Sequence, residues 1–218
     1  MQTIRQPAHL RRALDAHRDR GESIVLVPTM GSLHEGHLQL VRKAHDLGDV
    51  VVVSIFVNPM QFGPNEDFDA YPRTLNADRE KLFAEGVDYV FAPDANAVYP
   101  EGTDQQTVVR VPTLSNTLCG LNRPGHFDGV ATVVSKLFNM VQPHFAVFGE
   151  KDFQQLSIIR KMVEDLCMPI NIVGVATVRA QDGLALSSRN AYLSLEHRSV
   201  APLLHKILLE CREAIACG

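Results

Sequence analysis

A short turn at residues 30–37 carries the side chains best suited to binding a phosphorylated ligand. Its glycines let the backbone approach a ligand closely, because they have no side chain in the way. Its histidines, His34 and His37, can bind phosphate oxygens and protonate them as negative charge builds up there. No third histidine, cysteine or carboxylate joins this pair at the spacing of a metal site, so we do not expect the histidines to be metal ligands.

The residues on either side of this turn predict a strand before it and a helix after it. Residues 24–27 are apolar, and Leu40, Val41, Ala44 and Leu47 recur at helical spacing. A helix N-terminus presents unpaired N–H groups and a partial positive charge, which favour phosphate binding. Two histidines in a turn are often surface residues, but their place between a strand and a helix favours the functional interpretation.

Other segments offer amides and cations for the same site. Asn58 and Gln61 follow a second apolar run, and amides can orient a small polar substrate without introducing charge. Lys151 can act as a point charge on a phosphate, and Gln155 lies one helical turn beyond it. The guanidinium of Arg123 could bind a carboxylate or a phosphate with two donors. The groups that could close over a triphosphate are Ser187, Ser188 and Arg189.

Each of these segments also has a plainer interpretation, which is at least as good when the segment is taken alone. Asn58 could start a turn, and residues 119–129 could form a surface loop in which Asp128 caps the next helix. The charges around Lys151 could be a solvated cluster with Asp152 as a helix cap. Residues 186–190 could be an ordinary polar loop.

The elements that must position these groups follow from the apolar periodicity. We expect strands at residues 24–27, 50–57, 87–92, 144–148 and 170–175, and helices at residues 78–85, 129–141 and 153–166. This alternation predicts an α/β fold with a doubly wound parallel sheet. Ligands of such sheets bind at the C-terminal ends of the strands, which is where the motifs after Val27, Val57 and Phe148 lie.

The character of the chain changes after residue 176. A polar, turn-rich stretch is followed by Ser194, which could cap a helix at residues 195–216 whose apolar stripe needs a cover. We therefore expect one domain at residues 1–176 and the beginning of a second, smaller domain at residues 177–218.

Composition narrows the possible partners and location. The 218 residues carry a net charge of −4 without a basic run, so nucleic acid is not expected as a main partner. The four cysteines form no CxxC pair and are expected to be free thiols in a reducing cytosol. No stretch has the pattern of a signal peptide or the length to span a bilayer, so we expect a cytoplasmic protein with no membrane partner.

Taken together, the chemistry-bearing segments resemble the pantothenate synthetase (pantoate–β-alanine ligase) family. The resemblance rests on five segments in the same order, at residues 28–37, 56–62, 123–132, 149–155 and 187–190. It implies a Rossmann-like domain of the HxGH nucleotidylyltransferase superfamily, with a smaller C-terminal domain over the ATP site. It also implies that ATP and (R)-pantoate give pantoyl adenylate and pyrophosphate, after which β-alanine attacks to give pantothenate and AMP.

The resemblance implies roles for individual residues. His37, as proton donor, would act in catalysis with His34 and Lys151, while Gln61 and Gln155 would hold pantoate. Gln61 would also contact β-alanine. Mg²⁺ would accompany ATP, through ligands that the sequence does not identify, and two chains would form a homodimer. The ATP contacts would come from Met30, Gly31, Ser32, Leu33, His34, Glu35, Gly36, His37, Gly149, Glu150, Lys151, Asp152, Val178 (at the adenine), Leu186, Ser187, Ser188 and Arg189.

The chain departs from the family pattern in two places. Leu186 stands where many relatives have Met, which retains an apolar contact. Family chains also run several dozen residues further, so we expect only the start of the C-terminal domain and a weakened turnover. The alternatives are another HxGH nucleotidylyltransferase and a fragment that binds substrate without efficient turnover. A class I aminoacyl-tRNA synthetase shares the histidine turn, but this chain offers no basic surface for tRNA.

Overall fold

A computed structural model describes residues 1–218 and contains a six-stranded sheet with the strand order β1-β4-β3-β2-β5-β6. Each neighbouring pair of strands is parallel. The expected doubly wound, Rossmann-like α/β sheet is therefore confirmed. The strands are β1 (Gln2–Ile4), β2 (Ile24–Thr29), β3 (Val50–Ile55), β4 (Tyr89–Phe91), β5 (Phe145–Gly149) and β6 (Asn171–Val175).

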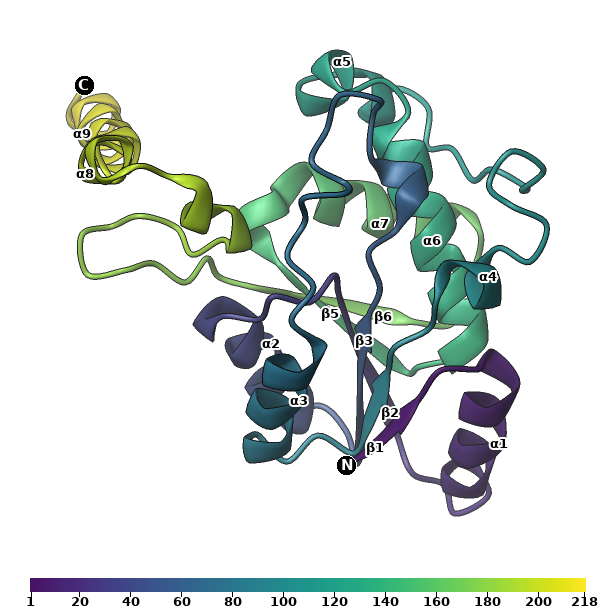
Figure 1. The fold of residues 1–218 in the computed structure, drawn as a ribbon. Helices are drawn as coiled ribbons and strands as arrows, with labels where there is room; N and C mark the ends of the chain where they lie inside the picture. The colour runs from purple at the N-terminus through teal and green to yellow at the C-terminus, as the bar shows by residue number, and fades with distance from the viewer.

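Helices cover both faces of the sheet, with α2 and α3 on one side and α1 and α6 on the other (Figure 1). The α-helices are α1 (Pro7–Arg18), α2 (Glu35–His45), α3 (Leu75–Ala84), α4 (Ala95–Val98), α5 (Cys119–Asn122), α6 (His126–Val141), α7 (Phe153–Asp165), α8 (Leu195–Val200) and α9 (Leu203–Cys217). Short 3₁₀ helices are η1 (Pro59–Gln61), η2 (Leu114–Asn116), η3 (Glu150–Asp152) and η4 (Ser188–Tyr192).

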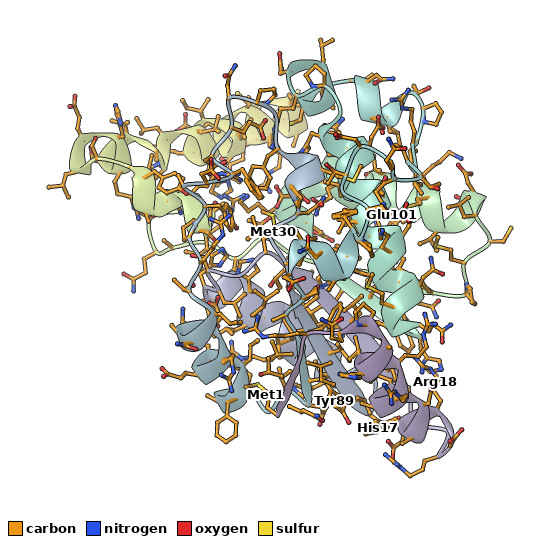
Figure 2. The ribbon with its side chains drawn as sticks, turned by 45° about the vertical axis from the view of Figure 1, so that its right-hand side comes forward. Met1, His17, Arg18, Met30, Tyr89 and Glu101 are labelled. Atoms are coloured by element: carbon orange, nitrogen blue, oxygen red, sulfur yellow. The ribbon has the colours of Figure 1, made fainter.

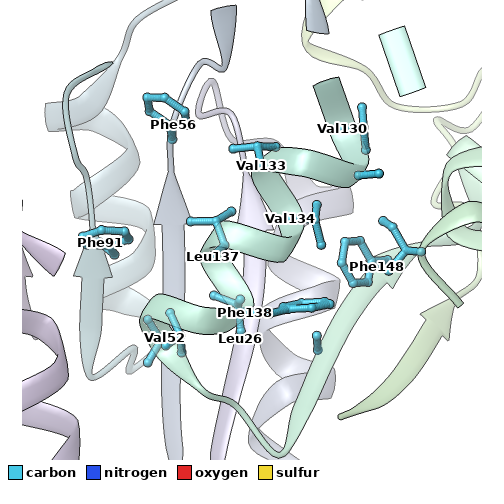
Figure 3. Close-up of a cluster of buried hydrophobic side chains, with 14 of the residues drawn as sticks. Leu26, Val52, Phe56, Phe91, Val130, Val133, Val134, Leu137, Phe138 and Phe148 are labelled. Carbon is cyan, nitrogen blue, oxygen red and sulfur yellow. The ribbon is translucent and has the colours of Figure 1, made fainter. Parts of the chain in front are cut away.

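The strand β2 separates two apolar cores, because successive side chains of a strand point to opposite faces. Leu26 packs in the core formed with α1, α6 and α7, whereas Val25 and Val27 pack in the core formed with α2 and α3. Figure 3 shows Leu137 and Phe138 of α6 over the first of these faces. Burial on both faces explains why the central strands are almost continuously apolar.

The structure corrects several expected elements. β1 and α1 were not predicted, and α3 begins at Leu75 rather than at residue 78. The single helix expected at residues 195–216 is broken into α8 and α9 at Pro202, because proline lacks an N–H donor and clashes with the preceding turn. Ser194 caps α8 as expected, through a hydrogen bond from the main-chain N–H of His197.

The apolar side chains of α9 remain uncovered, as its Leu204 shows with 69% exposure. The division of the chain at residue 177 stays a prediction. None of the helices combines the length and the apolar character that crossing a bilayer requires.

Candidate functional site

A cleft of about 250 Å³ lies where β2, β3 and β5 end. This is the edge of the sheet at which the sequence placed the chemistry-bearing motifs. The cleft is lined by residues from seven separate segments. They include Met30, His34, Gly36, His37, Asn58, Gln61, Tyr71, Arg123, His126, Gly149, Lys151, Asp152, Gln155, Val178, Leu186, Ser187, Ser188 and Arg189.

The turn after β2 has a strained backbone that a buried carboxylate holds in place. Gly31 and Ser32 have φ angles of 84° and 51°, in the left-handed region that only glycine adopts freely. The side chain of Asp78 on α3, with 0% exposure, accepts hydrogen bonds from the main-chain N–H of Ser32 at 2.9 Å and of Leu33 at 2.8 Å. From the same helix, Lys81 Nζ donates to the Leu33 carbonyl at 2.5 Å. The turn is therefore held by two side chains of α3, neither of which lines the cleft.

The two histidines lie together at the start of α2, with ring centroids 4.1 Å apart. His34 Nδ1 accepts a hydrogen bond from the main-chain N–H of Gly36, and His37 Nδ1 accepts one from the main-chain N–H of His34. A main-chain N–H can only donate, so Nδ1 of each neutral ring carries no proton. Each neutral ring therefore keeps its proton on Nε2, where it is a hydrogen-bond donor.

The charge state of this pair differs from the protonated donors that we expected. Burial, followed by the charge of His34 and of Lys151, lowers the pKa of His37 to about 3. Burial also lowers the pKa of His34, with smaller contributions from Lys151 and Lys81. In the free protein at neutral pH, both rings are neutral N–H donors, because desolvation disfavours the charged imidazolium.

A cation faces the histidines from the other side of the cleft. Lys151 lies in η3 directly after β5, and its Nζ is 3.6 Å from a carboxylate oxygen of Asp152. Both side chains are partly exposed, so this ion pair is weak and leaves the ammonium accessible. Gln155, in the first turn of α7, lines the same cleft. Residues 149–155 thus bring a positive charge and an amide toward the histidine turn.

Two arginines of the cleft are held by one acidic loop. Arg123 contacts Glu66 through two hydrogen bonds, the shorter at 2.5 Å, and Arg189 contacts Asp67 through two, the shorter at 2.8 Å. The side chain of Ser188 also donates to the main-chain oxygen of Ser32 at 2.9 Å. The bond from Ser188 holds the loop at residues 187–189 against the histidine turn, where the sequence analysis expected it.

Several expected site residues do not line the cleft. The Ser32 and Leu33 amides are occupied by Asp78, and Leu33 is buried in the apolar core with 3% exposure. The Glu35 side chain pairs with Arg42 on the outside of α2. The five residues of the expected ATP set that do not face the cleft are Gly31, Ser32, Leu33, Glu35 and Glu150.

Neither Asp128 nor Asp152 is a helix cap, as the plainer interpretations of their segments had it. The α6 helix begins after Gly125, and Asp128 lies inside its first turn, where it pairs with Arg110. Asp152 precedes α7 but makes no side-chain hydrogen bond to the helix N-terminus. The carboxylate of Asp152 is therefore left facing the cleft beside Lys151.

Sequence reasoning missed Asp78, Tyr71, Glu66 and Asp67. Asp78 stands in a charged helix segment, and nothing in its neighbourhood along the chain indicates a buried carboxylate. The acidic run that contains Glu66 and Asp67 was a detectable signal, because two clustered arginine-binding carboxylates lie in a loop directly after the Gln61 motif.

The structure contains no group of three or more His, Cys, Asp or Glu side chains that could hold a metal ion. Mg²⁺, however, commonly uses one or two carboxylates together with substrate phosphates and water. Asp152 is the one carboxylate of the expected ATP set that faces the cleft, so the site suits a Mg²⁺ ion carried by a nucleotide rather than a dedicated protein site.

The sequence of the chain is similar to those of one known protein family. The profile of a family described as pantoate-beta-alanine ligase matches residues 2–217. The pantothenate synthetase of Stutzerimonas stutzeri is 59% identical over 218 residues, which are 100% of this chain and 76% of that protein. The pantothenate synthetase of Pseudomonas entomophila is 60% identical over the same span, again covering 76% of its length.

Solved structures agree with the sequence relatives. Pantothenate synthetase from Thermus thermophilus superposes with a TM-score of 0.95 at 52% identity, over 100% of this chain and 77% of that one. Pantoate-beta-alanine ligase from Francisella tularensis, crystallised with a β,γ-ATP compound and β-alanine, superposes with a TM-score of 0.89 at 38% identity. That match covers 95% of this chain and 79% of the Francisella chain.

Proposed function

The chain belongs to the pantoate-beta-alanine ligase family, whose reaction is the ATP-dependent joining of pantoate to β-alanine, and we propose that its cleft performs this reaction through pantoyl adenylate. The observation that carries the proposal is the meeting of His34, His37, Lys151 and Gln61 around one cleft. The Francisella relative binds an ATP compound and β-alanine, which supports the use of both ligands by this chain.

In the first step, a carboxylate oxygen of pantoate attacks the α-phosphorus of ATP, and the bond to pyrophosphate breaks. This substitution needs positioning and neutralisation of phosphate charge more than covalent help. The ammonium of Lys151 and the Nε2–H groups of His34 and His37 supply donors for the phosphate oxygens. The guanidinium of Arg189 supplies a further cation once it leaves Asp67 for the phosphates.

The low pKa of His37 suits its proposed role. A neutral ring can donate a hydrogen bond to the triphosphate without first binding a proton from water. When the negative triphosphate lies beside it, the nearby charge raises the pKa of His37 and makes protonation of the ring easier. We assign His37 as the proton donor of the pair, and His34 lies beside it as a second hydrogen-bond donor.

In the second step, the amine of β-alanine attacks the acyl carbon of pantoyl adenylate. The C–N bond forms, the bond between the acyl carbon and AMP breaks, and the amine loses a proton. Gln61 and Gln155 hold pantoate throughout, and Gln61 also contacts β-alanine. A closed cleft protects the adenylate from water.

Further parts of the proposal concern the surroundings of the cleft. Met30, Gly36, Gly149, Val178, Leu186, Ser187 and Ser188 would contact ATP, with Val178 at the adenine ring. Mg²⁺ would arrive on the ATP phosphates and neutralise part of their charge, with Asp152 as its protein carboxylate. The homodimer and the cytoplasmic location stay predictions.

A pyrophosphate-release assay on the wild-type chain and on His37→Ala tests the proposal. We expect pyrophosphate release from ATP and pantoate, AMP release coupled to β-alanine, and a loss of at least roughly 100-fold in the variant. Undiminished release in His37→Ala would remove His37 from the mechanism. Another HxGH nucleotidylyltransferase would instead release a nucleotidylated product and would not depend on β-alanine.

A further inference from the structure

A buried chain of hydrogen bonds leads from Tyr99 to the cleft. The phenol of Tyr99 donates to Asn58 Oδ1 at 2.7 Å, and Asn58 Nδ2 donates to Gln61 Oε1 at 3.2 Å. Tyr99 is only 2% exposed and does not line the cleft, whereas Asn58 and Gln61 do. Tyr99 directly follows the short helix α4, far along the chain from the Gln61 motif. Two of the three groups thus belong to the wall of the cleft, and the third lies behind it.

Main-chain groups fix the direction of this chain. Asn58 Oδ1 also accepts from the main-chain N–H of Met60 at 3.3 Å, and Asn58 Nδ2 also donates to the Gly129 carbonyl at 3.1 Å. An N–H cannot accept and a carbonyl cannot donate, so the amide of Asn58 has only one orientation that satisfies both. Its nitrogen must therefore face Gln61, and the facing atom of Gln61 must be its oxygen.

The absence of a side chain at Gly129 lets α6 pack closely against η1, which carries Met60 and Gln61. A Cβ atom on Gly129 would lie 2.2 Å from the Met60 carbonyl oxygen, so any side chain there would push α6 away from η1. Tyr99 stabilises the same arrangement from the opposite side. Burial raises the pKa of Tyr99, so the phenol keeps its proton and remains a donor to Asn58 across the pH range of enzymes.

The consequence for Gln61 is a fixed polarity. Its oxygen is occupied by Asn58, so its Nε2 group is the part free to meet a ligand. In the absence of one, Nε2 lies 3.1 Å from the sulfur of Met30, which is a weak acceptor. An oxygen of a substrate hydroxyl or carboxylate is a stronger acceptor and would replace this sulfur contact.

We propose that Tyr99 is a positioning residue of the ligase, which holds Gln61 through Asn58 so that only the amide nitrogen of Gln61 faces the substrate. The site then selects a ligand that places an acceptor oxygen at this point. This inference rests on the proposed contact between Gln61 and pantoate, and it adds the residue behind that contact and the polarity that the contact must have.

The test compares Tyr99→Phe with Tyr89→Phe. Tyr89 also makes one hydrogen bond through its hydroxyl, to His17 Nε2 at 2.8 Å, so each variant deletes one bonded hydroxyl. Tyr89 and His17 lie well away from Met30 of the cleft (Figure 2). Steady-state KM values for pantoate and ATP are measured for both variants, together with their thermal unfolding.

We expect Tyr99→Phe to raise the KM for pantoate by roughly 3- to 10-fold, the size of one lost hydrogen bond, while the KM for ATP changes less than about twofold. Tyr89→Phe leaves both KM values at the wild-type level. If Tyr99 only filled the core, the Tyr99→Phe enzyme would lose thermal stability without a selective change in the KM for pantoate, and that result overturns the inference.

Two variants of Gln61 separate this inference from the function on which it rests. An unchanged pantoate KM in Gln61→Ala would mean that the Gln61–pantoate assignment has failed. A raised KM in Gln61→Ala with a wild-type KM in Tyr99→Phe would mean that only the positioning role has failed. Gln61→Glu keeps an acceptor for Asn58 but replaces the donor in the cleft, so we expect its pantoate KM to rise at least as much as in Gln61→Ala. A wild-type KM in Gln61→Glu would overturn the polarity, even if Tyr99→Phe did not fold.

Discussion

The buried carboxylate of Asp78 accepts a hydrogen bond from the main-chain N–H of Ser32 at 2.9 Å, and this bond ties helix α3 to the turn that carries the histidines. Ser32 has a φ angle of 51°, which a serine adopts only when its surroundings hold it there. Asp78 is therefore part of the reason that His34 and His37 face the cleft, although it lies outside the cleft itself.

Asp78→Asn tests this support. The amide keeps the size of the carboxylate but presents an NH₂ group to one of the two main-chain N–H donors, so one hydrogen bond is lost. We expect the free energy of unfolding to fall by about 2 kcal/mol, and kcat/KM for ATP to fall at least tenfold as the histidine turn shifts. Chemical denaturation and initial-rate kinetics measure the two effects.

Leu82→Ala is the matched control for this variant, because Leu82 lies on the same helix and is also 0% exposed. It leaves a cavity in the core and should cost roughly 2–5 kcal/mol of stability without a selective effect on ATP. Equal kinetic effects in Asp78→Asn and Leu82→Ala would mean that Asp78 acts only through global stability.

The stability of the protein should depend on pH through His37. Its pKa is about 3 in the folded state against an ordinary value of 6.5, so between these pH values the unfolded chain binds a proton that the folded chain does not. The free energy of unfolding must then fall as the pH is lowered from 6.5 toward 3, with a slope of up to about 1.4 kcal/mol per pH unit from this group. His37→Gln removes this contribution, and denaturation curves at several pH values measure it. An unchanged slope in the variant contradicts the prediction.

Lys151 should control the protonation of the histidine pair. Burial is the largest cause of the lowered pKa of both rings. The positive charge of Lys151 is the next cause for His34, and for His37 it follows the charge of His34. In Lys151→Gln we expect the pKa of His34 to move back toward its ordinary value, and the KM for ATP to rise as the phosphate cation is lost. NMR titration of the histidine ring protons follows the first effect. A His34 titration identical to that of the wild type would show that the Lys151 charge does not reach the rings.

Asp67 should compete with ATP for Arg189. The hydrogen bonds from Arg189 lower the pKa of Asp67, so the pair is charged at neutral pH, and a triphosphate must displace the carboxylate. Asp67→Asn weakens the pair, and we expect a KM for ATP that is roughly 2- to 5-fold lower. Both side chains are partly exposed, so stability should change by less than about 1 kcal/mol.

Asp182→Asn provides the control for that experiment, because Asp182 forms a similar exposed pair with Arg198 away from the cleft. Its KM for ATP should equal that of the wild type. A higher KM in Asp67→Asn would show that Asp67 helps nucleotide binding rather than competing with it.

The sequence predicted the elements with the most buried apolar residues. The valines of β3 and the apolar residues of α6 have no environment other than a core, so their pattern is unambiguous. β1 has only three residues, too few for a periodic signal. The break at Pro202 was overlooked because the apolar stripe continues in phase on both sides of it.

The site residues that could be predicted lie in the segments directly after a strand, as His34, Gln61 and Lys151 do. The supporting residues were not. Asp78 binds main-chain N–H groups that lie 45 and 46 residues away, and Tyr99 binds a side chain 41 residues away. Hydrogen-bond partners of this kind leave no local pattern, because any buried carboxylate or phenol could serve and only the fold decides which one does.

The bond between Ser188 and Ser32 spans 156 residues of the chain, which has a consequence for folding during synthesis. At the usual rates of translation, the ribosome needs roughly 10 to 30 s to add the residues between these two. The histidine turn and its strand are thus made long before the serine that closes over them. The nascent chain must keep its phosphate-binding edge open to solvent for that time, and the completed cleft is among the last parts of the molecule to form.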